Sequence, residues 1–253
     1  MISSIIKLTV SDFVLQILRN DALKYDFTKN DGQSNINGLL NQLIPNLIYY
    51  RKLRREKIYD ILENQFMRND TEKVYECVNN VIDEVYFSDA ELDALTEIVW
   101  FRPSEKKRAV FDEIEDSETR ITGKSTAAYL RGLLNEYSRL PQYKREKILF
   151  DDEFRNFAEA CATGKIFHAR VNGKSIRAFA FHYVYEYTYD QGNYLICLDL
   201  SNMIIGAIPL FKIRDSYVVE RKYKPTERLL EILQEYYESY EYSNIIKYEE
   251  ETK

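Results

Sequence analysis

The hydrophobic pattern divides the chain into a helical N-terminal part and a strand-rich C-terminal part. Residues 5–10 (IIKLTV) alternate apolar and polar side chains, which predicts a short strand. A helix follows over about residues 11–25, with Ser11 as its N-cap. A second helix is expected over about residues 35–66, with a kink or a new start at Pro45. The N-terminal part therefore begins as strand, helix, loop, helix.

The period of the pattern changes to two from about Lys165 onward. The dipeptide Asn172-Gly173 predicts a tight hairpin turn between the first two strands of this region. Three more alternating or apolar runs follow before residue 224. Five short strands with tight turns and no intervening helix predict a small antiparallel barrel. Pro225 then suits the first turn of an amphipathic helix.

The N-terminal part contains an internal repeat. Residues 125–148 match residues 35–58 at a spacing of 90 positions. Overlooking an internal repeat leads to a wrong fold assignment, so this match is considered first. The matching residues are Leu40 with Leu130, Leu43 with Leu133, and Arg55 to Ile58 with Arg145 to Ile148. We therefore expect the two segments to form equivalent helices.

A second strand precedes the second copy of the repeat. Residues 98–103 form a β-type run, and Ser104 precedes a helical stretch as Ser11 does in the first copy. The unit of strand, helix, loop and helix therefore occurs twice. If the strands are equivalent, one face of each points into the core and the other points outward. The outward side chains would be Lys7, Thr9, Trp100 and Arg102.

These patterns predict an α+β protein with three regions. Residues 1–150 form a tandem helical region, with copies at about 1–58 and 98–148 joined by an acidic helical connector at 59–97. Residues 151–224 form the small antiparallel barrel. Residues 225–253 form a C-terminal amphipathic helix and an acidic tail.

The charge is distributed unevenly along the chain. The net charge is −6, yet residues 1–58 carry +4 and residues 98–148 carry +3, whereas the connector carries −9. Two basic copies indicate an anionic partner such as nucleic acid. The candidate phosphate-binding cations are Arg51, Lys52, Arg54, Arg55, Lys144 and Arg145. The alternatives are a solvated helix face that pairs with the acidic connector, or structural pairing between the copies.

Composition and motifs limit the classes of protein to which this chain can belong. The three cysteines are far apart and odd in number, which fits a reducing cytoplasm, with each thiol as a core residue. We expect neither a signal peptide nor a membrane-spanning run. The sequence has no phosphate-binding glycine loop and no HExxH or paired-cysteine motif, and its two histidines do not form a metal site. We therefore expect neither an enzyme nor a bound cofactor.

The doubled unit resembles the ribbon-helix-helix fold. In that family two copies, normally from two subunits, pair their strands into an antiparallel ribbon that enters the DNA major groove. The resemblance implies a pseudo-dimer within this one chain. The four outward side chains of its ribbon would then contact the nucleic acid. The bulky Trp100 beside Arg102 suits stacking on an unpaired base at least as well as it suits a groove.

Residues 165–223 resemble the WYL domain, an SH3-like barrel. The Trp-Tyr-Leu run of that family stands here as Asn193-Tyr194-Leu195, and its closing Arg-Leu-x-Arg-Ile pattern stands as Pro209-Leu210-Phe211-Lys212-Ile213. The resemblance and the local charge suggest a cleft that binds a ligand. The candidate cleft residues are His168, Arg170, Arg177, His182, Tyr194 and Lys212. For the two histidines, a structural hydrogen bond is the alternative.

The combination of both regions resembles the WYL accessory proteins encoded beside the RNA-targeting effector of type VI-D CRISPR–Cas systems. This resemblance implies a homodimeric, cytoplasmic protein that binds single-stranded RNA, or single-stranded DNA, and enhances the effector nuclease, which is itself a possible partner. The alternative function is a DNA-binding transcriptional regulator with a ligand-sensing WYL domain. A third is a protein-binding module whose basic faces dock the effector.

Overall fold

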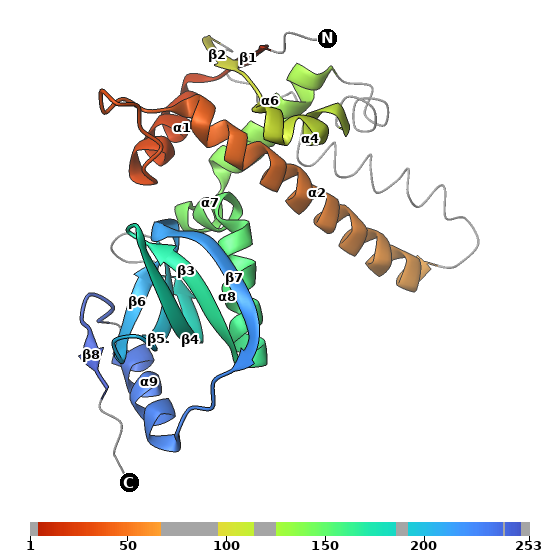
Figure 1. Ribbon diagram of the computed structural model, residues 1–253. Helices are drawn as coiled ribbons and strands as arrows, with labels where there is room; N and C mark the ends of the chain where they lie inside the picture. The colour runs from red at the N-terminus through yellow and green to blue at the C-terminus, as the bar shows by residue number, and fades with distance from the viewer. Residues whose placement is uncertain (1–4, 67–95, 114–124, 186–191, 240, 249–253) are drawn as a thin grey trace. The chain divides into compact units, whose positions relative to one another are not determined.

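The computed structural model describes residues 5–66, 96–113, 125–185, 192–239 and 241–248 (Figure 1). Two compact units make up the chain, Met1–Leu140 and Pro141–Lys253, and we describe each separately. Both units combine helices with antiparallel strands, so the predicted α+β class is confirmed. Most of the predicted acidic connector and the end of the tail lie outside the described residues.

The N-terminal unit contains two strands and several helices. In chain order these are β1 (Ile6–Val10), α1 (Asp12–Lys24), α2 (Ile36–Phe66), β2 (Glu97–Phe101), a 3-10 turn η2 (Glu105–Lys107), α4 (Arg108–Glu113) and α6 (Thr126–Arg139). Ser11 caps α1 through its side chain, which accepts a hydrogen bond from the Val14 N–H (3.3 Å). The α2 helix continues through Pro45, so the predicted new start at that residue is wrong.

The strands β1 and β2 pair with each other in antiparallel register, although about 90 residues separate them. Leu8 lies opposite Val99, and Ile6 lies opposite Phe101. Leu8, Val10, Val99 and Phe101 are buried, whereas Lys7, Trp100 and Ile98 are exposed. The pairing of the two predicted strands is therefore confirmed, together with the face that each turns outward.

The buried positions of α2 and α6 repeat at the spacing found in the sequence. The pairs, each 90 positions apart, are Leu39 with Tyr129, Leu40 with Leu130, Leu43 with Leu133, Ile44 with Leu134, and Leu47 with Tyr137, and all ten are buried. The caps repeat as well. The Asn35 side chain accepts from the Gly38 N–H (2.9 Å), and the Ser125 side chain accepts from the Ala128 N–H (3.3 Å).

The C-terminal unit is a six-stranded antiparallel sheet with helices. Its elements are α7 (Gln142–Leu149), α8 (Asp151–Thr163), β3 (Lys165–Val171), β4 (Lys174–Tyr185), β5 (Asn193–Asp199), β6 (Ile204–Pro209), a 3-10 turn η4 (Leu210–Lys212), β7 (Ile213–Lys222), α9 (Glu227–Ser239) and β8 (Ile246–Lys247). The predicted boundary at residue 150 comes later than the division after Leu140. The difference arises because α7 is bound to the sheet.

The strands of this sheet follow the order β7-β3-β4-β5-β6-β8 (Figure 1). The predicted hairpin joins β3 to β4, and Asn172 (φ 48°) and Gly173 (φ 80°) both take the left-handed conformation that such a turn requires. Across the described strands, β7 and β8 form opposite edges and do not pair, so the predicted small antiparallel barrel is corrected to an antiparallel sheet that does not close. The short tail strand β8, which the sequence did not predict, occupies the edge of β6 where a closing strand would pair.

Helices cover both faces of the sheet. Phe157 of α8 meets Phe167 of β3 edge to face, with ring centroids 5.4 Å apart. The other face carries a cluster that contains Phe179 of β4 and Leu229 and Leu233 of α9. The strand pairing explains this division, because Phe167 and its neighbour Ile166 point to opposite sides and Phe179 lies opposite Ile166.

Candidate nucleic-acid interface

The outward face of the β1–β2 ribbon presents an aromatic ring beside a cation. Lys7 and Trp100 lie directly opposite each other, and the Lys7 Nζ is 5.9 Å from the centroid of the Trp100 ring. The Trp100 side chain is 61% exposed, which is high for the largest aromatic side chain. The next pair is Thr9 with Ile98. This face offers a flat ring and one positive charge, with few groups for hydrogen bonding.

Two asparagines of α2 fix the end of β2, where the predicted site residue Arg102 lies. Asn37 Oδ1 accepts from the Arg102 N–H (2.8 Å), and Asn41 Nδ2 donates to the Arg102 carbonyl (3.0 Å). Asn41 Oδ1 also accepts from the Ser104 N–H (2.6 Å). The backbone of Arg102 is therefore held against the first turns of α2 while its side chain is exposed.

The basic cluster of α2 is partly internal. Arg51 is buried, and its guanidinium lies 5.0 Å from the centroid of the Tyr129 ring. Arg54 forms an ion pair with Glu136 (2.5 Å). Burial raises the pKa of the Glu136 carboxyl, and the cations of Arg54 and Arg51 oppose that shift.

Three residues of the predicted phosphate-binding surface are buried, namely Arg51, Arg55 and Arg145. Arg51 and Arg55 are buried, because the helix face that carries them turns into the protein. Lys52 is exposed and stays a candidate. Arg145 of α7 is buried as well, whereas its neighbour Lys144 is exposed. Part of the basic pattern is therefore structural, as the alternative interpretation held.

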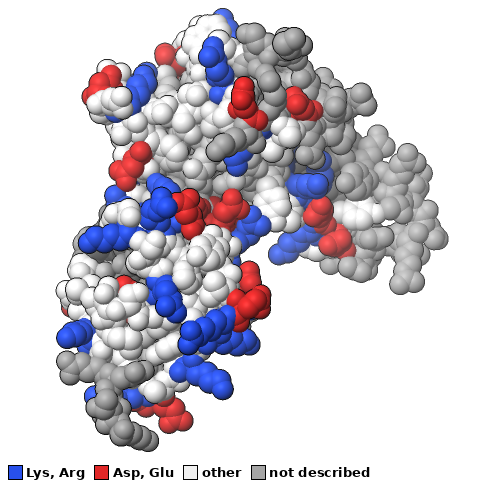
Figure 2. Space-filling model, in the orientation of Figure 1, with Lys and Arg blue, Asp and Glu red and all other residues white. Residues whose placement is uncertain are grey.

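A row of three side chains crosses the outer part of the sheet in the C-terminal unit. Tyr217 of β7 lies opposite His168 of β3, which lies opposite Arg177 of β4. The rings of His168 and Tyr217 are stacked, with centroids 5.0 Å apart and planes at 20°. Tyr217 is 54% exposed, and Arg177 is exposed. We call these three residues the sheet row. Several Lys and Arg side chains lie on the face of this unit seen in Figure 2.

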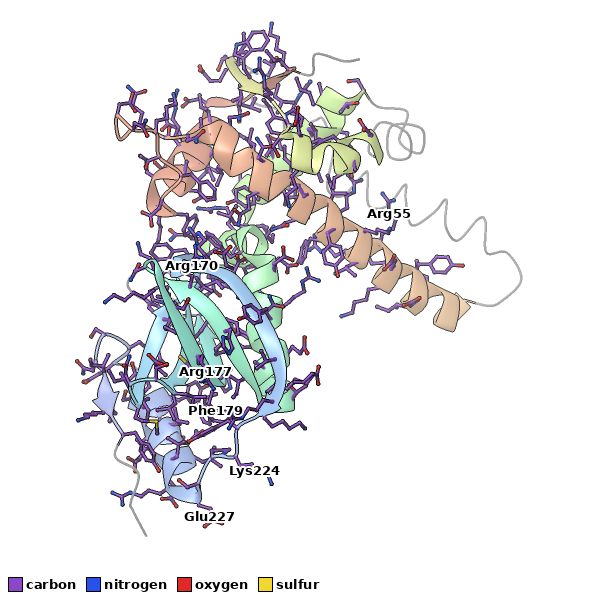
Figure 3. All side chains as sticks on the ribbon, in the orientation of Figure 1. Arg55, Arg170, Arg177, Phe179, Lys224 and Glu227 are labelled. Atoms are coloured by element: carbon purple, nitrogen blue, oxygen red, sulfur yellow. The ribbon has the colours of Figure 1, made fainter. Side chains whose placement is uncertain are left out.

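Further cations flank the sheet row along the strands. Arg170, two residues beyond His168 on the same face, forms an exposed ion pair with Asp215 (3.2 Å). In Figure 3, Arg170 lies toward the hairpin end of the sheet, Arg177 lies further along it, and Lys224 lies beyond the end of β7. The structure thus brings together three of the six predicted cleft residues, namely His168, Arg170 and Arg177.

The other three predicted cleft residues lie elsewhere in the unit. His182 stacks on Tyr237 of α9 with centroids 4.6 Å apart. Tyr194 approaches Tyr242 (5.8 Å), and the Lys212 Nζ lies over the Phe211 ring at 4.6 Å. The Nδ1 of His182 forms a hydrogen bond with the Tyr183 carbonyl (2.6 Å), which fits the structural alternative for this histidine.

A buried carboxylate joins the two sequence runs that resemble the WYL domain. Glu146 of α7 accepts from the Asn193 N–H (2.8 Å) and from the Asn193 Nδ2 (2.8 Å). Its other oxygen accepts from the Phe211 N–H (3.2 Å). Asn193, which stands where that family has Trp, also donates to the Tyr143 carbonyl (2.8 Å). Both runs are therefore anchored on α7.

A cavity of about 460 Å³ opens beside the sheet row. Its lining residues are Ile166, Arg177, Leu200, Met203, Arg221, Lys222, Tyr223 and Lys224. Of these, only Arg177 was a predicted site residue. The run Arg221-Lys222-Tyr223-Lys224, which interleaves cations with an aromatic ring, was the available signal in the sequence, together with the period-two placement of Tyr217 and Arg221.

Replacing Arg177 by alanine should raise the pKa of His168. Burial lowers that pKa, and the Arg177 cation lowers it further. A lowered pKa means that the folded protein disfavours the imidazolium. The stability penalty is therefore absent above the unfolded pKa of about 6.5, develops as the pH falls from that value to the folded pKa, and is complete below the folded pKa. An NMR titration of the imidazole protons measures the shift. An unchanged pKa of His168 in the variant would show that the Arg177 cation does not lower it.

The described residues contain no group of three His, Cys, Asp or Glu side chains placed to hold a metal ion. Burial raises the pKa of the Cys161 and Cys197 thiols to about 12, so both are protonated near neutral pH. Cys77 lies outside the described residues. None of the described helices combines the length and the apolar sequence that crossing a bilayer requires.

Comparison with known proteins shows a likeness of fold to a solved structure. Neither a protein-family model nor a curated protein matches the sequence. A solved structure called "Crystal structure of a CRISPR Cas-related protein" matches with a TM-score of 0.64 and 12% identity, over 91% of this chain and 66% of that chain. This match shows a shared fold, and the chain spans 66% of its neighbour's length.

A second solved structure, "Proteasome accessory factor B/C (PafBC) of Arthrobacter aurescens", covers 87% of this chain and 35% of its own. It matches with a TM-score of 0.26 and 10% identity. A likeness at that level does not establish a shared fold.

Proposed function

We propose that this chain is a CRISPR-associated accessory protein that binds single-stranded RNA and enhances an RNA-targeting effector nuclease of the type VI-D class. In this proposal the N-terminal unit is a single-chain ribbon-helix-helix region and the C-terminal unit is a WYL-like domain. The protein has no catalytic role of its own, and it acts as a homodimer. The observation that carries the proposal is the exposed Trp100 beside Lys7 on the ribbon.

The chemistry of the ribbon favours an unpaired strand over a duplex. Reading a duplex requires side chains that exchange hydrogen bonds with base edges in the groove. Two of the central outward side chains, Trp100 and Ile98, are a bulky ring and a hydrocarbon. An indole face instead stacks on an exposed base, and the neighbouring ammonium of Lys7 attracts the phosphate beside it.

The C-terminal unit supports the proposal with a second surface of the same kind. The sheet row combines the stacked rings of His168 and Tyr217 with the cation of Arg177. The neighbour with the shared fold is described as CRISPR Cas-related, which agrees with the resemblance found in the sequence. That resemblance is the basis for proposing that the protein enhances the effector nuclease and that its ligand is RNA.

One titration separates the three functions. The full chain is titrated with labelled single-stranded RNA, single-stranded DNA and duplex DNA at two salt concentrations. Phosphate contacts make affinity fall steeply with salt. Tight RNA binding with weak duplex binding supports the proposal, and the reverse order supports the transcriptional regulator. Absence of binding at low salt leaves the protein-binding module, which a co-purification with the effector then tests.

Replacing Trp100 or Arg102 by alanine should weaken RNA binding by about tenfold each without unfolding the protein. Loss of one stacked base costs about 1–3 kcal/mol, and both side chains are exposed. Fluorescence anisotropy measures the affinity, and circular dichroism checks the fold. Trp100→Phe should restore part of the affinity. Ile98→Ala, a change of an exposed side chain on the same ribbon face, is the control. Unchanged affinity in both variants removes the ribbon from the interface.

A further inference from the structure

The cavity beside the sheet row is lined by four cations. Arg177 comes from β4, Arg221 and Lys222 come from the end of β7, and Lys224 follows them. Three of these cations lie within residues 221–224, and the fold brings Arg177 from a distant segment to the same opening. A volume of about 460 Å³ lies within the range of about 300–1,000 Å³ that small-ligand sites occupy.

The positive charge of the cavity has no acidic counterpart in its lining. None of the lining residues is Asp or Glu. The nearest acid along β7, Glu220, is bound to Lys165 at 2.9 Å. Within the described parts of the chain, no ion pair engages any of the four cations. Like charges placed together without counter-ions repel one another, so an anion that enters the cavity relieves that repulsion.

The remaining wall of the cavity is apolar. Ile166 is buried, Leu200 and Met203 are half-buried, and Tyr223 is half-buried with its ring 5.3 Å from that of Phe179. An apolar wall accepts a sugar and a flat base, and it lowers the local dielectric constant, which strengthens the attraction between the cations and a phosphate. The cavity therefore suits a nucleotide better than an inorganic ion alone.

We propose that this cavity binds a terminal phosphomonoester of a nucleotide. A phosphomonoester carries about −1.5 to −2 charges near pH 7, whereas a phosphodiester inside a strand carries only one. Four cations therefore favour the terminal group. Arg177 belongs both to the cavity and to the sheet row. A strand that stacks on His168 and Tyr217 would end with its phosphate in the cavity.

This inference rests on the proposed function for the strand, but the cavity itself can be tested separately. The full chain is titrated with two versions of one short single-stranded RNA, one ending in a 5′-phosphate and one in a 5′-hydroxyl, and with free AMP. The terminal phosphate should tighten binding by about tenfold, since each hydrogen bond to a charged group is strong. In the unmodified protein, inorganic phosphate should compete with the terminal phosphate of the strand and so cancel the gain in affinity.

The double variant Arg221→Ala with Lys224→Ala should abolish the gain from the 5′-phosphate and leave the affinity for the 5′-hydroxyl strand within about twofold. Both side chains are exposed, so the fold should survive. Lys174→Ala removes one exposed cation at the β3–β4 turn, outside the cavity, and is the matched control.

The outcomes separate the two proposals. If AMP binds and the terminal phosphate does not raise the affinity for the strand, the phosphomonoester that the cavity binds is that of a free nucleotide. If AMP binds and no strand binds, the proposed function fails and the cavity stands. Equal affinity for both strands together with absence of AMP binding overturns the inference and leaves the proposed function intact.

Discussion

Replacing Glu146 by alanine should destabilise the C-terminal unit by about 2–5 kcal/mol. The carboxylate accepts hydrogen bonds from Asn193 N–H, Asn193 Nδ2 and Phe211 N–H, and the Asn193 donors are buried. Without it these donors lose their partner in a place that water does not reach, and each such loss costs about 1–3 kcal/mol. Urea unfolding followed by far-ultraviolet circular dichroism measures the loss.

The chain provides its own reference for this experiment. Trp100, the only tryptophan, lies in the N-terminal unit, so its fluorescence follows that unit alone. That transition should stay at the same urea concentration. Glu146→Gln, which keeps one oxygen acceptor, should lose less stability than the alanine variant. Asp152→Ala, a change of an exposed acid on α8, is the matched control. A loss below about 1 kcal/mol would show that the three hydrogen bonds do not anchor α7.

Replacing His168 and Tyr217 together by alanine should weaken single-stranded RNA binding by about 100-fold. The two rings form one stacked platform, and loss of base stacking costs about 1–3 kcal/mol per base. Removing both rings leaves no aromatic surface on the sheet row. Fluorescence anisotropy at fixed salt gives the affinity, and the salt dependence should hardly change, because the cations remain.

Conservative changes distinguish stacking from other losses at the same site. Tyr217→Phe keeps the ring and should retain most of the affinity. Tyr217 also approaches the His168 Nδ1 with its hydroxyl (3.4 Å), so this variant shows whether that contact matters. An affinity within twofold of the unmodified chain in the double alanine variant would place RNA binding elsewhere.

The ribbon was predictable from the internal repeat together with the fold that the repeated unit resembles. Single-sequence patterns report local structure, and they rarely say which strand pairs with which. Here the match between residues 35–58 and 125–148 indicated that the preceding strands are equivalent, and the resemblance of the doubled unit to the ribbon-helix-helix fold implied the pairing of β1 with β2. The outward face followed from the period of two within each strand.

The fate of the basic cluster was not predictable from the same patterns. Charges on a helix indicate a polar face, but they do not reveal what lies opposite. Arg51 meets the Tyr129 ring and Arg54 meets Glu136, and both partners belong to the second copy of the repeat. The cations therefore stabilise the contact between α2 and α6, and only exposed members such as Lys52 stay available to a ligand.

The cavity escaped prediction for a related reason. Three of its four cations lie within residues 221–224, but only the sheet order brings Arg177 of β4 beside them. The pattern also gave no indication that the sheet stays open, and it contains nothing about the two-residue strand β8, which pairs with β6. Edge pairing by so short a segment leaves no period in the sequence.

A ribbon built from one polypeptide does not come apart on dilution, since its two strands share a covalent backbone. It is also released from the symmetry that identical subunits impose. Lys7 faces Trp100, and Thr9 faces Ile98, so the two edges of the surface differ in chemistry. A palindromic target is then not required. Each half has been free to diverge, and the ligand can be bound in one direction only.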